Sequence, residues 1–155
     1  RAKDVMSRLA DMGPGTTFHR VIGETESIAP DGEVRRVVLS SGKVYFDLLK
    51  ARAEKGDKSV ALIRIEQLYP FPFKTLADLL RRYPRADIVW CQEEPQNMGA
   101  WGFVDRRIER VLAGLDSVAK RPRFAGRAEA ASPATGLFKR HLHEQAQLVQ
   151  DALAA

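Results

Sequence analysis

Apolar runs alternate with helical patterns through the middle of the chain. Three short runs are apolar on both faces and predict buried strands, and the segments between them carry apolar residues at helical spacing. This alternation is typical of a mainly parallel sheet covered by helices on both sides. In chain order we expect a strand within 34–40, a helix over 43–55 closed by Gly56, a strand over 60–65, a helix over 73–83, a strand over 88–91 and a helix around 104–115.

The flanking segments predict further elements. Thr17–Ile22 has the character of a short strand, and Arg121–Gly126 that of a strand after the last central helix. Ser132-Pro133 resembles a helix N-cap followed by proline at the first helical position, so we expect the final helix to begin there and reach about Leu153. Its predicted buried side consists of Phe138, Leu142, Ala146, Val149 and Leu153.

Near the start of the chain, residues 4–12 suggest the end of a short helix, which Gly13-Pro14-Gly15 interrupts. We therefore divide the chain into a lead-in segment, 1–16, from a preceding domain, and an α/β domain over 17–155. Because the chain begins with Arg1 and not with Met, we expect it to be part of a longer protein.

Composition supports a globular domain. A chain of 155 residues with 45% hydrophobic and 29% charged residues can bury a sizeable core, which excludes a disordered tail, a collagen-like fibre and a disulfide scaffold. No uncharged apolar run approaches a membrane span, so we expect no membrane partner. The single Cys91 follows an apolar run, Ile88–Trp90, and is interpreted as a core residue and not as a nucleophile.

The net charge of +5 permits a nucleic-acid partner without favouring one. The basic residues are spread over the chain, and the densest basic stretch, 120–127, lacks the interleaved aromatic pairs on which single-strand binders stack bases. We therefore expect no nucleic-acid partner, and rank an anionic ligand or an acidic protein surface above it.

Two motifs resemble binding sites in part. Ser41-Gly42-Lys43 lacks the upstream glycine and the following Ser or Thr of a phosphate-binding loop, although a weak anion site at this strand-to-helix turn stays open. His141 and His143 are two residues apart on a predicted helix, so they point in different directions and do not hold one metal ion together.

The carboxyl ends of the predicted strands carry most of the candidate chemistry. Arg64 lies in a strand otherwise built for burial and needs a carboxylate partner, for which we expect Glu66, Glu93 or Glu94. The two adjacent glutamates could serve acid–base chemistry, but no Ser, Cys or His base accompanies them, so pairing with cations is favoured. The candidate rim or effector site comprises Lys43, Arg64, Glu66, Gln67, Glu93, Glu94 and Asn97.

Four stretches together carry a family resemblance. They are Arg36–Tyr45, Arg64–Pro72, Trp90–Trp101, and Arg123–Arg127 with the nearby Ala131–Gly136. In this order they resemble the C-terminal domain of the thiamin-diphosphate-dependent decarboxylase component of the 2-oxoglutarate dehydrogenase complex. The resemblance implies a transketolase-C-terminal-like, three-layer αβα fold with a mostly parallel five-stranded sheet. Its one antiparallel edge strand would be the 17–22 segment.

The resemblance also implies a function for the parent protein. That enzyme decarboxylates 2-oxoglutarate on thiamin diphosphate and Mg²⁺ and passes the succinyl group to a lipoyl arm. The Gly-Asp-Gly and Asn-Asn elements that hold this cofactor are not in this sequence. The resemblance therefore implies that the preceding domains bind it, and that this chain alone binds no cofactor and is inactive.

The same resemblance implies partners and a compartment. We expect contacts with the preceding catalytic domains, a homodimer and the lipoyl succinyltransferase component, with Phe71, Met98 and Trp101 as candidate interface residues. Some family members bind regulatory nucleotides or acetyl-CoA at or near this domain. The location would be the cytoplasm of a bacterium, which is favoured, or the mitochondrial matrix of a eukaryote. The alternative is a stand-alone α/β module that binds an anionic nucleotide or a CoA-type effector.

Overall fold

A five-stranded sheet forms the centre of the protein. The computed structural model describes residues 5–154. The spatial order of the strands is β1-β3-β2-β4-β5, with β1 antiparallel to β3 and all other neighbours parallel. The predicted fold class, including the antiparallel edge strand, is thereby confirmed. The strands are β1 (Val21–Ile22), β2 (Arg36–Ser40), β3 (Val60–Ile65), β4 (Asp87–Pro95) and β5 (Arg123–Arg127).

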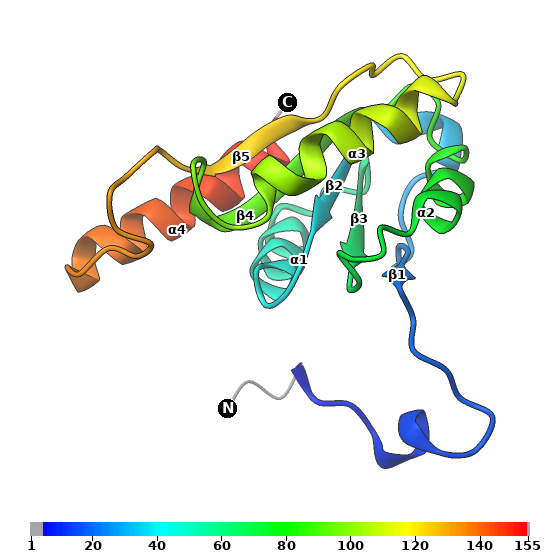
Figure 1. The fold of residues 1–155 in the computed structure, drawn as a ribbon, viewed down its shortest axis with the longest axis horizontal. Helices are drawn as coiled ribbons and strands as arrows, with labels where there is room; N and C mark the ends of the chain where they lie inside the picture. The colour runs from blue at the N-terminus through cyan, green and yellow to red at the C-terminus, as the bar shows by residue number, and fades with distance from the viewer. Residues whose placement is uncertain (1–4, 155) are drawn as a thin grey trace.

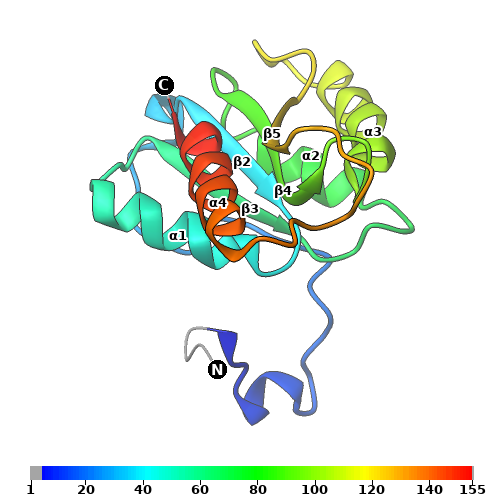
Figure 2. The ribbon, with the colours of Figure 1, turned by 90° about the vertical axis from the view of Figure 1, so that its left-hand side faces the viewer.

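Four helices cover the two faces of this sheet (Figures 1 and 2). They are α1 (Val44–Lys55), α2 (Phe73–Leu80), α3 (Trp101–Ala113) and α4 (Phe138–Leu153). Helices α1 and α4 pack on one face, and α2 and α3 pack on the other. Within residues 5–154, none of these helices is both long and apolar enough to cross a lipid bilayer.

Alternate side chains of each central strand enter different cores. Val37 and Leu39 of β2 lie in the core under α2 and α3, whereas Val38 lies in the core under α1 and α4. All three are fully buried. This two-sided burial explains why the central strands have continuous apolar runs instead of an alternating pattern.

Gly56 ends α1, as predicted. Its φ of +64° is in the left-handed region that glycine adopts without steric cost, and its N–H donates to Ala53 O. The next amide, of Asp57, donates to Arg52 O, which completes the capping pattern. The chain then turns directly into β3.

The last helix corrects one prediction. It begins at Phe138 and not at Ser132-Pro133, because the Ser132 hydroxyl donates to Ala134 O at 3.4 Å instead of capping a helix. The predicted buried side also fails at its first three positions, because Phe138 is 72% exposed, Leu142 is 52% exposed and Ala146 is exposed as well, whereas Val149 and Leu153 are buried as predicted. The first half of the helix extends past the sheet (Figure 1), so only the second half has a core to pack against.

Other boundaries also differ from those predicted. Strand β1 comprises only Val21–Ile22 of the predicted 17–22 segment. Helix α2 ends at Leu80 instead of Tyr83, with Tyr83 buried in the turn that follows. Strand β4 continues to Pro95, well past the predicted end at Cys91, because its polar continuation pairs with β5 as far as Arg127.

The described part of the lead-in segment, residues 5–16, extends away from the sheet and helices (Figure 1). Within the described part of the short helix expected over 4–12 lies the 3₁₀ turn Leu9–Met12, followed by Gly13; Asp4 lies outside the described residues. Several apolar side chains of the segment are at least half exposed, namely Val5, Met6, Leu9 and Met12, and so is Phe18, which follows the segment.

Candidate functional site

The carboxyl ends of the parallel strands meet at the edge where ligands usually bind in open α/β sheets. Strand β2 pairs with β3 on one side and with β4 on the other, so the connections after β2 and β4 diverge. Lys43, after β2, forms an ion pair with Glu93 of β4 at this point of divergence. Lys43 Nζ also lies 3.9 Å from Asp47 Oδ2 of α1.

Arg64 pairs with one of its three predicted partners. Its Nε lies 3.5 Å from Glu66 Oε1, which confirms the expected carboxylate contact. Its guanidinium also stacks over Tyr45, 4.6 Å from the ring centre, a distance at which a cation is attracted to an aromatic face. The buried Nε nevertheless donates no hydrogen bond, so it has capacity for a further acceptor.

These residues border a hollow of about 540 Å³, which we call the rim hollow. Lys43, Arg64 and Glu66 line it together with aromatic residues of α1, and Met6 and Asp11 of the lead-in segment close its other side. Two cations beside an apolar wall can bind an anionic group that carries an apolar or ring portion. The hollow is therefore the candidate binding site.

The remaining rim residues make separate contacts. Gln67 Nε2 donates to Pro70 O at 2.6 Å. Asn97 exchanges two hydrogen bonds with the Ala130 backbone, at 3.0 and 3.2 Å, which ties the β4–α3 connection to the segment after β5. Glu94 is exposed. None of these three lines the rim hollow.

The candidate interface residues are more enclosed than surface anchors. Phe71 is only 8% exposed and packs edge-on against Phe73, with ring centres 5.0 Å apart. Trp101 is half-buried against Phe124, and Met98 is half-buried as well. Within this chain they contribute to packing, and their interface role stays a prediction.

Gln92 organises the β4–α3 connection, a role that sequence reasoning missed. Its side chain is 4% exposed, and its Oε1 accepts from Trp90 Nε1 and from Trp101 N, both at 2.9 Å. Its Nε2 donates to Pro95 O at 3.1 Å and to Met98 O at 2.7 Å. One buried amide thereby shapes most of the Trp90–Trp101 stretch.

A buried ion pair, Glu24–Arg52, was also missed. Both side chains are 4% exposed, and two hydrogen bonds of 2.5 and 3.0 Å join them. Arg52 also donates to Val60 O at 2.8 Å, and the Leu62 amide donates to Glu24 at 2.7 Å. The position of Arg52 on the apolar face of its predicted helix was the signal that a buried carboxylate must accompany it.

Cys91 is a core residue, as predicted. Its side chain is fully buried, and burial raises the pKa of the thiol to about 12. A thiol of this kind is a poor nucleophile at neutral pH. Among residues 5–154, no group of three or more His, Cys, Asp or Glu side chains is arranged to hold a metal ion.

Comparison with known proteins identifies the family. Residues 6–153 match the family described as "2-oxoglutarate dehydrogenase C-terminal". The chain belongs to this family. Proteins named "2-oxoglutarate dehydrogenase E1 component" from Brucella ovis and Brucella canis are each 48% identical to it over 99% of the chain, and that of Brucella abortus (strain S19) is 47% identical. The resemblance in the four sequence stretches is thus confirmed.

This member of the 2-oxoglutarate dehydrogenase C-terminal family spans 16% of the length of those relatives. Two of the four stretches now have a physical role. Trp90–Trp101 is the connection that Gln92 organises, and Arg64–Pro72 carries the arginine of the rim hollow and the buried Phe71.

Proposed function

We propose that this chain is the C-terminal assembly and regulatory domain of a 2-oxoglutarate dehydrogenase. The parent enzyme decarboxylates 2-oxoglutarate and succinylates the lipoyl arm of the succinyltransferase component, in the cytoplasm of a bacterium. The domain supports the preceding catalytic domains and the homodimer. The observation that carries the proposal is the match of residues 6–153 to the C-terminal family, together with relatives named as the E1 component.

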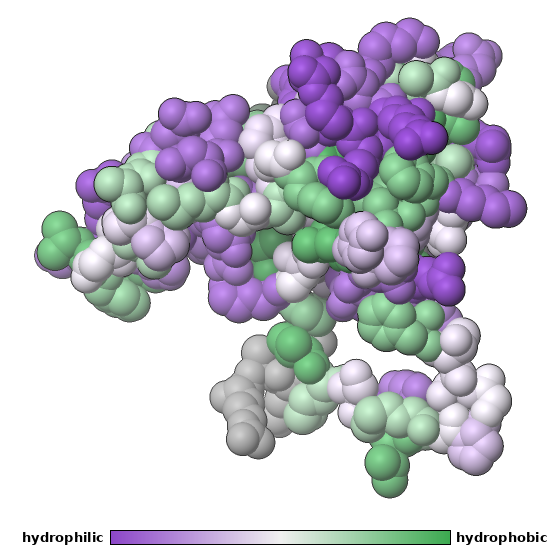
Figure 3. All heavy atoms as spheres, in the orientation of Figure 1, coloured by the Kyte–Doolittle hydropathy of each residue, from purple (hydrophilic) through white to green (hydrophobic). Residues whose placement is uncertain are grey.

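Exposed apolar side chains support the assembly role, and hydrophobic atoms are visible along the N-terminal segment in Figure 3. The lead-in segment presents Leu9 at 84% and Met12 at 70% exposure, Phe18 just after it is 64% exposed, and Tyr69 in the connection after β3 is 80% exposed. Apolar side chains gathered in this way mark surfaces that another part of a protein covers. The preceding domains of the same chain are the partner that the segment's position favours.

The cofactor is assigned to the preceding domains. Thiamin diphosphate needs a divalent cation and carboxylate or amide ligands for it. The charged groups of the rim hollow, Asp11, Lys43, Arg64 and Glu66, combine two carboxylates with two cations and do not form such a ligand set. On this proposal the isolated chain releases no CO₂ from 2-oxoglutarate, even with added thiamin diphosphate and Mg²⁺.

A domain exchange tests the proposal. The segment of the Brucella ovis E1 component that matches this chain is replaced by residues 1–155, and a second version ends before that segment. We expect the hybrid to form dimers by light scattering and to oxidise 2-oxoglutarate with the other complex components, whereas the truncated version does neither. Lys74→Gln in the hybrid, at a 91% exposed α2 position, serves as the matched control and should change nothing.

The opposite results would overturn the proposal. A truncated enzyme that keeps its dimer and its full activity would show that this domain is dispensable for assembly. Turnover by the isolated chain would place the chemistry within residues 1–155.

The rim hollow favours a second candidate function, the binding of an anionic nucleotide or a CoA-type effector. The observation behind it is the unsatisfied Nε of Arg64 beside Lys43 and the Tyr45 ring. Calorimetric titration with AMP and with acetyl-CoA tests it. We expect saturable heat that Arg64→Gln abolishes and Lys74→Gln leaves unchanged; no heat at high micromolar ligand would exclude this function.

A further inference from the structure

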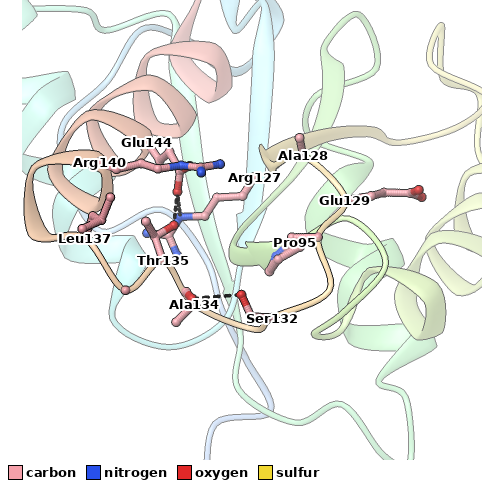
Figure 4. Close-up of a pocket in the computed structure, with 12 residues that line it drawn as sticks. Pro95, Arg127, Ala128, Glu129, Ser132, Ala134, Thr135, Leu137, Arg140 and Glu144 are labelled. Carbon is pink, nitrogen blue, oxygen red and sulfur yellow. Dashed lines mark hydrogen bonds and ion pairs between the residues drawn. The ribbon is translucent and has the colours of Figure 1, made fainter.

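A second cavity lies between the end of β5 and the start of α4 (Figure 4), away from the residues proposed for the rim hollow. Its volume is about 530 Å³, which is within the usual range for small-molecule sites. The segment after β5 and the first turns of α4 form its walls, and we call it the α4 cavity. The polar side chains used below are Arg127, Ser132, Thr135, Arg140 and Glu144.

Arg127 is the buried cation of this cavity. Its side chain is only 8% exposed, and its Nε donates no hydrogen bond although Glu144 Oε2 lies 3.2 Å away. Its Nη2 is held by His141 Nδ1 at 3.0 Å and Gln145 Oε1 at 3.2 Å. A guanidinium in this position is fixed in orientation and keeps an unused donor, which is the arrangement that recognises oxyanions.

The start of α4 adds a second attraction for anions. Leu137 at the N-cap provides no side-chain cap, and intrahelical bonding begins only with His141 N to Leu137 O. The first turn contains no acidic residue, and instead contains Lys139 and Arg140. Positive side chains at the positive end of the helix dipole raise the free energy of the helix unless an anion lies beside them.

Glu144 now supplies that negative charge. It accepts from the Thr135 hydroxyl, and it lies 2.6 Å from Arg140 Nε as well as near Arg127. The Thr135 hydrogen bond, followed by that of Arg140, lowers the pKa of Glu144. One carboxylate therefore serves two guanidinium groups, and the other acid of the lining, Glu129, points away from them (Figure 4).

We propose that the α4 cavity binds the phosphate group of a phosphorylated small molecule. The phosphate contacts Arg127 Nε, Arg140 and the free amides at the start of α4, and Glu144 moves aside to admit it. The volume beyond the phosphate accommodates a sugar-sized portion against Pro95 and Leu137. This site is independent of the proposed assembly function, because it needs no dimer and no catalytic domain.

Phosphate titration followed by ¹H–¹⁵N NMR tests the proposal on the 155-residue chain. The probes are inorganic phosphate and glycerol 3-phosphate, with sodium chloride at equal ionic strength as the reference. We expect saturable shifts of the Gly136, Leu137 and Lys139 amides. Glycerol 3-phosphate should bind more tightly than inorganic phosphate, because it fills more of the cavity.

Three variants separate a binding site from a purely structural cluster. Glu144→Gln removes the competing charge and keeps the size of the side chain, so phosphate should bind about tenfold more tightly. Arg140→Gln should weaken binding about threefold, because its guanidinium is largely exposed. Lys74→Gln, which removes one exposed cation in α2, should leave the affinity unchanged.

Other outcomes would overturn the site. Amide chemical shifts that change linearly with phosphate concentration and do not saturate would indicate nonspecific screening of charges. Shifts confined to Lys43 and Arg64 would assign the phosphate to the rim hollow. An unaltered or weaker affinity in Glu144→Gln would show that Glu144 does not compete with the ligand. In each case the domain exchange described above would still decide the assembly function separately.

Discussion

At the scale of single residues, the Glu24–Arg52 pair is the clearest source of stability. Replacing Arg52 with Met leaves the Glu24 carboxylate buried without its partner, which we expect to lower the free energy of unfolding by about 3 kcal/mol or more. Urea denaturation measures the change. The double variant Glu24→Gln/Arg52→Met should recover part of the loss, and a double variant less stable than Arg52→Met would contradict this account.

The same pair predicts a pH dependence. Burial alone would raise the pKa of Glu24, but hydrogen bonds from Arg52 and from the Leu62 and Glu26 amides, with the charge of Arg52, bring it below its ordinary value of 4.5. A carboxylate with a lowered pKa in the folded state stabilises the fold above its unfolded pKa and loses this contribution as the pH falls through its folded value. Glu24→Gln should therefore lose less stability than the wild type between about pH 6 and pH 3.

The matched control for this pH profile is Glu54→Gln, in an exposed α1 pair whose side chains are 79% and 66% exposed. An exposed pair of this kind contributes little to stability, so its profile should parallel that of the wild type. Unfolding midpoints measured across the pH range compare the three proteins. Identical slopes for wild type and Glu24→Gln would mean that Glu24 titrates alike in the folded and unfolded chains.

At the scale of elements, the β4–α3 connection depends on a glycine. Gly99 has a φ of +65°, and a Cβ there would lie 2.9 Å from Gln92 Nε2 and 3.0 Å from Glu94 Cβ. Gly99→Ala should therefore lower the free energy of unfolding by about 2 kcal/mol, through backbone strain and the displacement of Gln92. Gly102→Ala is the control, because nothing lies within 4 Å and alanine favours the helix by up to about 1 kcal/mol. Thermal denaturation measures both effects: relative to the wild type, the unfolding midpoint should be lower for Gly99→Ala and higher for Gly102→Ala.

The type and position of an element could be predicted from the sequence where burial of an apolar run alone determines them. The segment Val60–Ile65 is apolar throughout, and its place within the sheet follows directly from that run. The start of α4 was not predictable in this way, because Ser132-Pro133 has the chemistry of a helix start while the residues after it enclose a cavity. The partner of Arg52 was hidden for a different reason: Glu24 is 28 residues away, and only the pairing of β1 with β3 brings it near.

At the scale of the whole molecule, the two hydrophobic cores are well buried, whereas the lead-in segment exposes apolar side chains. The sheet buries its apolar residues against helices on both faces, whereas the lead-in segment has no cover within residues 5–154 for most of its apolar side chains. The exposed side chains of the lead-in segment therefore offer a test of the proposed assembly role. If the preceding domains cover the lead-in segment, its side chains should become protected when those domains are present.

The oxidation rates of the three methionines of the chain can show whether the lead-in segment is covered. Met6 and Met12 lie in the lead-in segment and are 68% and 70% exposed, whereas Met98 is half-buried and its carbonyl accepts a hydrogen bond from the Gln92 side chain. Oxidation by dilute hydrogen peroxide, read by peptide mass spectrometry, should therefore modify Met6 and Met12 faster than Met98 in the isolated chain. In the dimeric hybrid with the Brucella ovis catalytic domains, Met6 and Met12 should be protected while the rate at Met98 serves as the internal reference. Equal oxidation of Met6 and Met12 in both proteins would show that the lead-in segment stays uncovered, and the apolar surface would then need another partner.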